Sequence, residues 1–253
     1  MSKLPKASKF LDLSDYGRLA ARLIANSLKH TSFTPIHVTI GFIISGLLSI
    51  GCMLKGYYWG AALFLILKSI LDAADGELAR VKNTPSYTGR YFDSVADIIL
   101  NTLIFIAIWY ITDANTLTTF FAFLGIQLQG TLYNYYYVIL RNKLDGDKTS
   151  RIFERKPPKA MEGESQQTVN VLFWMYRTLY GFFDRVIYLL DRGAYQGKQI
   201  PNWLMTAVST LGLGFQLLII SVMLVLGWID YIIPFFIAYS GMILIFVGIR
   251  KIV

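Results

Sequence analysis

Cysteine, histidine and charged side chains are all scarce in this sequence. Its 253 residues include one cysteine and two histidines, and only 16% of the residues are charged. A single cysteine excludes an intramolecular disulfide, and so few thiols and imidazoles argue against a zinc site. The low charge, the apolar fraction of 55% and the mean hydropathy of +0.48 exclude an ordinary soluble domain and favour a membrane protein.

Long apolar segments make up most of the chain. Six of them have about 20 residues or more, the length that a helix needs to cross a bilayer, and they lie near 34–54, 57–80, 88–111, 116–140, 202–228 and 230–249. The first opens with Thr34-Pro35, a helix-start signal. We therefore predict an all-α membrane protein with six transmembrane helices in a domain of residues 34–253, preceded by an N-terminal amphipathic segment of residues 1–33.

Basic residues cluster between the apolar segments and give the chain a net charge of +8. An even number of spans places both termini on one side, and that side also carries the basic run 141–198. The positive-inside rule makes this side cytoplasmic, in a bacterial inner membrane or an organelle membrane. Attraction to anionic lipid headgroups would use the same residues. This distribution argues against a nucleic-acid partner.

Two further segments have the composition of helices that lie along a membrane surface. Apolar residues recur near helical spacing over residues 10–29, with basic residues between them; this pattern predicts an amphipathic interfacial helix or a short surface helix packed on the bundle. Residues 168–190 are long enough to span but carry three charges, so we predict a cytoplasmic interfacial helix within an insertion at 142–200. The polar residues 142–165 contain two consecutive prolines and predict a loop.

Four aspartates lie inside the second and third predicted spans, where a carboxylate costs about 2.5–3.5 kcal/mol at the bilayer centre. Asp72 and Asp75 are three residues apart and share a helix face, and Asp93 and Asp97 share one at a spacing of four. At about 1.5 Å per residue from the connecting turn, Asp75 and Asp93 reach similar depths, and so do Asp72 and Asp97. We therefore predict two facing pairs of carboxylates in a cavity open to the cytosol.

Oxygen ligands without histidine or cysteine favour hard divalent cations such as Mg²⁺ or Mn²⁺. Two such ions would balance four carboxylates and would suit a displacement at phosphorus. Gly76, Ala79 and Gly89 keep bulky side chains away from the aspartates, although small residues also serve helix packing alone. Arg80 at the mouth suits a phosphate group, because its planar guanidinium matches two oxygens.

These residues together resemble the signature of the CDP-alcohol phosphatidyltransferase family, D-x2-D-G-x2-A-R-x8-G-x3-D-x3-D. Every fixed position is present, as Asp72, Asp75, Gly76, Ala79, Arg80, Gly89, Asp93 and Asp97. The resemblance implies a homodimeric membrane enzyme in which the four aspartates hold two metal ions against the pyrophosphate of a CDP-linked alcohol. It also implies that Asp97 acts as the general base, and that the CDP pocket is lined by Gly76, Ala79, Arg80 and Gly89.

The opening of the first span departs from the family pattern. Many relatives carry Pro-Asn-x-x-Thr there, whereas residues 35–39 of this sequence read Pro-Ile-His-Val-Thr. Ile36 cannot hydrogen-bond as an asparagine does. His37 could replace that contact with the nucleotide, or it could lie at the interface without a special role.

Polar residues near the predicted cavity are candidates for an acceptor pocket, namely Lys68, Asn134 and Arg141. Lys68 lies one helical turn before Asp72, so it could instead pair with that carboxylate.

The resemblance favours transfer of a phosphatidyl group from CDP-diacylglycerol to the hydroxyl of a small polar alcohol, with release of CMP. A CDP-choline or CDP-ethanolamine phosphotransferase acting on a lipid alcohol shares the signature, but six spans favour the first activity. A divalent-cation transporter would spread its carboxylates along the whole depth of the bilayer. The four aspartates instead lie in the cytoplasmic half, which makes transport the remote alternative.

Overall fold

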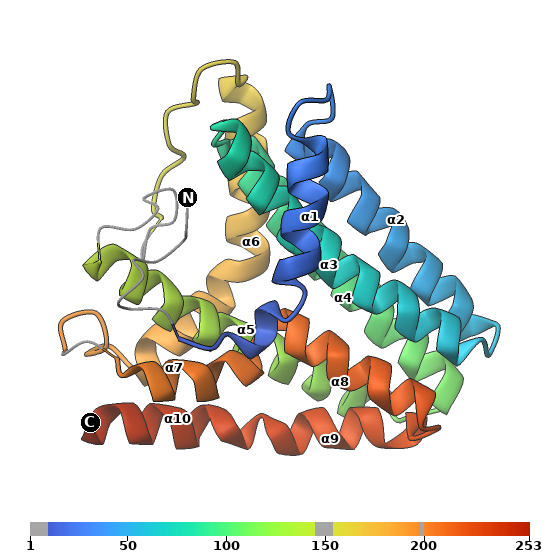
Figure 1. Ribbon diagram of the computed structural model, residues 1–253. Helices are drawn as coiled ribbons and strands as arrows, with labels where there is room; N and C mark the ends of the chain where they lie inside the picture. Colours follow the sequence, from blue (N-terminus) through green and yellow to red (C-terminus); the bar gives the residue numbers. More distant parts are fainter. Residues whose placement is uncertain (1–9, 145–153, 198–199) are drawn as a thin grey trace.

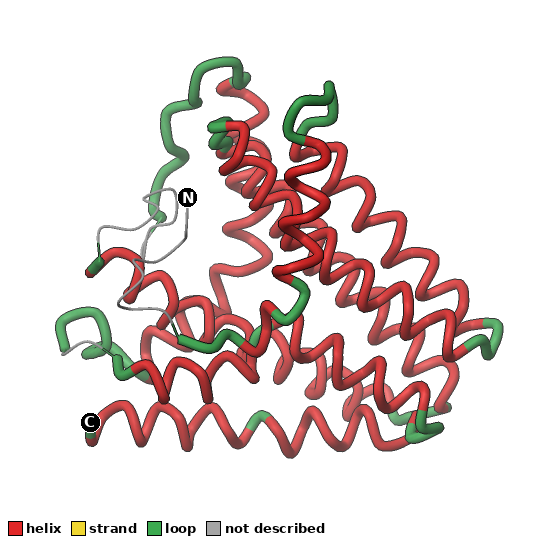
Figure 2. Tube along the Cα trace, in the orientation of Figure 1, coloured by secondary structure: helices red, strands yellow, loops and turns green. Residues whose placement is uncertain are grey.

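The structure of the protein, a computed structural model, describes residues 10–144, 154–197 and 200–253 (Figure 1). Throughout these residues the regular structure is helical, which confirms the predicted all-α class (Figure 2). The elements are η2 (Leu13–Asp15), α1 (Arg18–Leu28), α2 (Pro35–Leu54), α3 (Tyr58–Lys82), α4 (Tyr87–Thr112), α5 (Thr116–Lys143), α6 (Gln166–Leu190), α7 (Asn202–Val208), η3 (Ser209–Leu211), α8 (Leu213–Val225), η4 (Ile229–Tyr231), α9 (Ile232–Tyr239) and α10 (Gly241–Ile252).

Three helical segments of the described chain are long and apolar enough to cross a membrane: α2, α4 and the stretch from Ile229 to Ile252. The pair formed by residues 202–211 and 213–225 is bent by 51° and would make a fourth span. α3 and α5 are also long helices, but they do not belong to this set. α3 carries Lys68 and the two aspartates of the signature, and polar residues lower the hydropathy of α5. Six spans therefore remain a proposal.

The start of α2 shows what His37 does in this chain. Thr34 is the N-cap residue and Pro35 occupies the first helical position, where its missing N–H costs nothing. The backbone N–H of Thr34 donates to Nδ1 of His37 at 3.0 Å, and the two residues form a capping box. His37 therefore stabilises the helix end, a role that the sequence does not reveal.

α3 runs through the middle of the bundle, with α2 on one side and α1 and α8 packed against it elsewhere (Figure 1). The hydroxyl of Ser45 donates to the carbonyl oxygen of Phe64 at 2.8 Å, and that of Ser49 donates to the carbonyl oxygen of Ala61 at the same distance. Such contacts need small side chains, because only these let two helix backbones approach closely. This packing fixes the helix that carries Asp72 and Asp75.

The segment before α1 is held against the far end of the chain. The amide of Leu13 donates to Oγ of Ser209 at 2.9 Å, and the amide of Gly214 donates to Oγ of Ser14 at 3.1 Å. A Cβ atom on Gly214 would overlap the backbone of Ser14, so this approach requires glycine. In place of one helix over residues 10–29, the structure has the short 3₁₀ turn η2 followed by α1, which begins at Arg18.

α1 packs on α3 through a face of small residues and leaves apolar side chains in the open. Ala21 and Ala25 are fully buried in a cluster with Ala74 and Leu78 of α3. Leu19 and Leu23 are 77% and 72% exposed. The structure thus shows a helix packed on the bundle. Its exposed apolar edge suits a membrane interface, and that location stays a prediction.

α6 confirms the helix predicted near 168–190, and it packs against α4 and α5. Residues 154–165 ahead of it contain no regular helix or strand, as the predicted loop at 142–165 requires. The remainder of that loop, residues 145–153, lies outside the described residues, whereas residues 142–143 belong to the end of α5.

A buried ion pair ties the end of α6 to the C-terminal helix. Asp191 is 0% exposed, and its Oδ2 accepts hydrogen bonds from Nε of Arg250 and from the hydroxyl of Tyr136, each at 2.6 Å. Asp191→Asn is expected to lower the free energy of unfolding by about 3–5 kcal/mol, because it leaves the largely buried guanidinium of Arg250 without its counter-charge. Thermal unfolding in detergent measures this loss. The exposed Asp230→Asn is the matched control, and equal melting temperatures for the two variants would contradict the prediction.

Candidate active site

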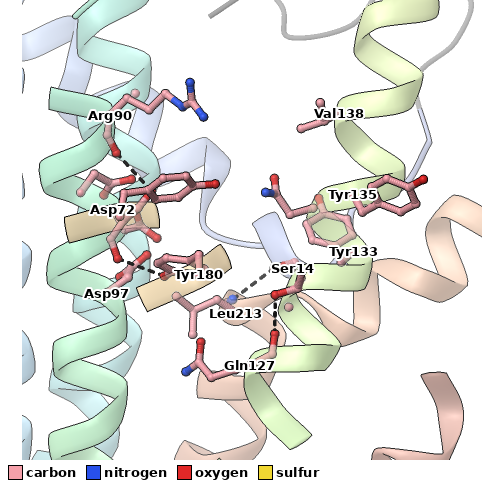
Figure 3. Close-up of a pocket in the computed structure, with 18 of the residues that line it drawn as sticks. Ser14, Asp72, Arg90, Asp97, Gln127, Tyr133, Tyr135, Val138, Tyr180 and Leu213 are labelled. Atoms are coloured by element: carbon pink, nitrogen blue, oxygen red, sulfur yellow. Dashed lines mark hydrogen bonds between the residues drawn. The ribbon is translucent and has the colours of Figure 1, made fainter. Parts of the chain in front are cut away.

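A cavity of about 880 Å³ lies between two helical walls. α3 and α4 supply one wall and α5 the other, while α6, the segment before α1 and the start of α8 complete the lining. Figure 3 shows Asp72 and Asp97 on the first wall, with Gln127 and Tyr133 on the second. The volume is typical of a small-molecule site, and the carboxylates of the signature border it.

Three of the four aspartates come together at this wall. α3 presents Asp72 and Asp75, α4 presents Asp93, and one carboxylate oxygen from each lies within 4.8 Å of the others. Asp75 is 8% exposed, and its Oδ2 accepts a hydrogen bond from Oγ1 of Thr39 at 2.7 Å. α2 therefore helps to orient the cluster through a threonine that follows the family pattern.

The chemistry of this cluster fits a metal ion. Three carboxylates at such distances repel one another unless positive charge compensates them. Oδ1 of Asp93 is buried and has no hydrogen-bond partner within residues 10–144, 154–197 and 200–253. A donor set made only of carboxylate oxygens suits a hard divalent cation. Asp72, Asp75 and Asp93 are the residues that would hold it.

Asp97 lies in the same cavity but has a partner from the protein. Its carboxylate forms an ion pair with Nζ of Lys68, a side chain that is 0% exposed. The Lys68 ammonium also lies 4.9 Å from the ring centroid of Phe42. The structure thus groups three aspartates and pairs the fourth with a lysine, in place of the two facing pairs that depth counting predicts.

The small residues and the arginine of the signature differ in whether they line the cavity. Gly76 and Arg80 line the cavity, and Nη2 of Arg80 lies 3.2 Å from Oε1 of Glu77. Ala79 and Gly89 are not among the lining residues. The amide of Gly89 donates instead to Oγ of the N-cap residue Ser86 at 2.8 Å, so Gly89 has a structural role at the start of α4.

Comparison with known proteins identifies the family. Residues 32–161, about half of the chain, match the family model for CDP-alcohol phosphatidyltransferase. The chain belongs to this family. A 68-residue stretch is 40% identical to a CDP-diacylglycerol–serine O-phosphatidyltransferase of Bacillus subtilis (strain 168), and it covers 27% of this chain. The match spans 38% of the length of that curated relative.

Three residues are predicted for the acceptor pocket of this phosphatidyltransferase family member, and one of them lines the cavity. Asn134 of α5 lines it, whereas Lys68 and Arg141 do not. Lys68 pairs with Asp97 and not with Asp72. Arg141 is 7% exposed, and its guanidinium lies 5.8 Å from the ring centroid of Tyr137. The structure therefore leaves Asn134 as the acceptor candidate from this group.

α6 and the residues just before it supply a part of the site that the sequence analysis missed. The hydroxyl of Tyr180 donates to the carbonyl oxygen of Ser94 on α4 at 3.0 Å, and its ring lies beside Asp97 (Figure 3). Oε1 of Glu154 lies 2.6 Å from Nη1 of Arg90. Burial and the nearby carboxylate of Asp184 raise the pKa of Tyr176, so its phenol stays protonated. The sequence does contain a signal for this part of the site, namely the charged residues inside the otherwise apolar segment 168–190.

Proposed function

We propose that the protein transfers a phosphatidyl group from CDP-diacylglycerol to the hydroxyl of a small polar alcohol and releases CMP. The observation that carries this proposal is the cluster of Asp72, Asp75 and Asp93, which borders the cavity of a chain from this family. The name of the curated relative supports CDP-diacylglycerol as the donor.

In the proposed reaction, the acceptor hydroxyl gives its proton to Asp97 and its oxygen bonds to the β-phosphorus of the donor. The bond from that phosphorus to the bridging oxygen breaks, and CMP leaves with the electron pair. Asp72, Asp75 and Asp93, together with Asp97, would hold two Mg²⁺ or Mn²⁺ ions, which supply positive charge against the pyrophosphate. Arg80 orients a phosphate oxygen, and Gly76 leaves room for the nucleotide.

Release of CMP from purified protein tests this function. CDP-diacylglycerol is supplied with a panel of small alcohols, and CDP-choline or CDP-ethanolamine is supplied with diacylglycerol in a parallel series. We expect CMP only in the first series. CMP only in the second series would make the protein a head-group phosphotransferase. Mg²⁺ flux into proteoliposomes without CMP in either series would indicate a transporter.

Arg80 gives a prediction about donor binding. Arg80→Ala is expected to weaken CDP-diacylglycerol binding by about 1.5–3 kcal/mol, the value of a hydrogen bond to a charged group, and lysine should restore it in part because it lacks the planar fork. Equilibrium binding of the donor measures the change. Arg22→Ala is the control, because Arg22 approaches the same Glu77, at 3.7 Å, without lining the cavity. Equal losses in both variants would assign the effect to Glu77.

We further propose six membrane spans: α2, α3, α4, α5, the bent pair α7–α8, and α9–α10. Both termini would be cytoplasmic, with α1 and α6 at the cytoplasmic interface and two copies of the chain forming a homodimer. The basic residues of the chain support this orientation, because they gather on one side of such a topology.

Cysteine labelling tests the orientation. In a Cys52→Ser background and sealed, oriented vesicles, Thr84→Cys in the α3–α4 turn should react with an impermeant maleimide from the cytoplasmic side. Lys55→Cys in the α2–α3 turn should react only from the opposite side. Both native side chains are exposed, so access to the reagent depends on the membrane. The reverse pattern would overturn the proposed orientation.

A further inference from the structure

Arginine is concentrated around the cavity, and half of these residues have acidic partners. Six arginines line the cavity, namely Arg18, Arg80, Arg90, Arg155, Arg177 and Arg185. Arg18 and Arg80 pair with Glu77, and Arg90 pairs with Glu154. Arg177 and Arg185 lie on α6, and Arg155 lies in the segment 154–165 ahead of it. Within the described parts of the chain, none of these three forms an ion pair with a carboxylate.

The side of α6 that faces the cavity is distinct from its packed side. Phe173, Phe183 and Ile187 are buried on the packed side. Arg177 and Arg185 line the cavity, and both residues are exposed. Nη1 of Arg177 donates to the carbonyl oxygen of Arg155, and its guanidinium lies 5.2 Å from the ring centroid of Trp174. These contacts hold Arg177 in place without neutralising its charge.

The resulting wall carries excess positive charge. Arg155, Arg177 and Arg185 contribute three guanidinium groups, and α6 adds one carboxylate, Asp184, to the same lining. Glu154 is already paired with Arg90. Guanidinium groups bind carboxylate and phosphate through paired hydrogen bonds. The ligand that matches this wall is therefore an anion.

The position of the wall relative to Asp97 indicates which substrate carries that anion. Tyr180 lies beside Asp97 (Figure 3). Arg177 is one helical turn before Tyr180 and Arg185 is a little more than one turn after it, so each is about 5–8 Å along the helix from the tyrosine. α6 also lies wholly outside residues 32–161, which match the family model and contain the signature. The donor site belongs to that shared part, and so does Arg155, whereas Arg177 and Arg185 lie outside it.

We infer that the α6 wall binds an anionic group, a carboxylate or a phosphate, on the acceptor alcohol, with Arg177 and Arg185 as its specificity determinants. The inference rests on the proposed transferase function. The acceptor hydroxyl lies at Asp97 while its anionic group lies at the arginines. Selection for such an acceptor follows because a substrate without the anion leaves these charges unmatched.

Two matched pairs of acceptors test this inference in the full-length protein. Serine and ethanolamine differ by a carboxylate, and glycerol 3-phosphate and glycerol differ by a phosphate. CMP release is measured in detergent without anionic lipid, with CDP-diacylglycerol as donor. We expect activity with the anionic member of one pair, and at least about tenfold lower kcat/KM with the member that lacks the anion.

Variants then assign the selection to residues. Arg177→Gln and Arg185→Gln are expected to raise the acceptor KM about 10- to 100-fold and to leave the donor KM within about twofold. Arg177→Lys should recover part of the loss. Arg192→Gln removes the same charge from an exposed position outside the cavity lining, and its acceptor KM should not change. Thermal unfolding confirms that each variant is folded. If a glutamine variant does not fold, the acceptor KM of Arg177→Lys tests the site instead.

Three results would overturn the inference. Equal kcat/KM for both members of the active pair would show that no anion is recognised. A donor KM that rises in parallel with the acceptor KM would assign the wall to the donor phosphates. An equal effect of Arg192→Gln would assign it to general surface charge. If no acceptor yields CMP from any CDP-linked donor, the proposed function itself fails and the inference falls with it.

Discussion

Asp97→Asn is expected to lower the rate of CMP release by about 10²–10⁴-fold, the usual contribution of a general base. Asparagine keeps the shape of the side chain but cannot accept the proton of the acceptor hydroxyl. Donor affinity should change much less, because Asp72, Asp75 and Asp93 form their cluster without Asp97. Steady-state kinetics and equilibrium donor binding, measured on the same preparation, separate the two effects.

The ion pair with Lys68 complicates a single substitution at Asp97. Lys68 is 0% exposed and pairs with this carboxylate, so Asp97→Asn leaves a buried ammonium without a counter-charge, at a cost of about 3–5 kcal/mol. The double variant Lys68→Met/Asp97→Asn removes both charges. It should melt at a higher temperature than the single variant and remain inactive.

This comparison distinguishes a base from a structural residue. If the double variant regained turnover together with stability, Asp97 would serve only to neutralise Lys68. If Asp97→Asn kept turnover within about tenfold of wild type while donor affinity collapsed, Asp97 would be a ligand and not the base.

Helix limits could be predicted closely wherever the signal is local. The segments 34–54 and 116–140 correspond to α2 at Pro35–Leu54 and α5 at Thr116–Lys143. Thr34 caps the first of these helices, and Asn115 caps the second by accepting from the amides of Leu117 and Thr118. Caps and apolar periodicity are properties of neighbouring residues, so sequence alone contains them.

The break in the fifth predicted span depends on a distant segment. The sequence favours one helix near 202–228, but the backbone at Gly212 is extended and the chain continues as α8. Ser14, almost two hundred residues earlier, contacts Gly214 and would overlap a Cβ atom at Gly212. Hydropathy over a window cannot detect such a contact, because the contact joins the two ends of the chain.

The candidate site shows the same difference between features set by neighbouring residues and features set by distant ones. The three-residue spacing of Asp72 and Asp75 predicts a shared helix face, and the structure brings Asp93 to that face. Lys68 is one turn from Asp72 on its own helix, yet it pairs with Asp97 on α4. That choice depends on how α3 and α4 are rotated against each other, and spacing along a single helix does not report this rotation.

Removal of divalent cations is expected to abolish CMP release completely. The carboxylate oxygens of Asp72, Asp75 and Asp93 approach within 4.8 Å of one another, where each pair of unit charges repels by about 3–4 kcal/mol at an effective dielectric constant of about 20. An anionic pyrophosphate would add to this repulsion. The three carboxylates therefore cannot bind the donor until positive charge is restored.

Chelation followed by repletion measures this dependence, with a binding readout beside the activity. Mg²⁺ or Mn²⁺ should restore turnover and should raise the melting temperature of the chelated protein, because a ligand that binds only the folded state stabilises it. Asp93→Asn should abolish the shift in melting temperature, whereas the exposed Asp230→Asn should retain it. Two Mn²⁺ ions per chain are expected at saturation. Full activity in excess chelator would contradict the metal site. A single bound ion would mean that Asp97 does not bind metal, because its ion pair with Lys68 already neutralises that carboxylate.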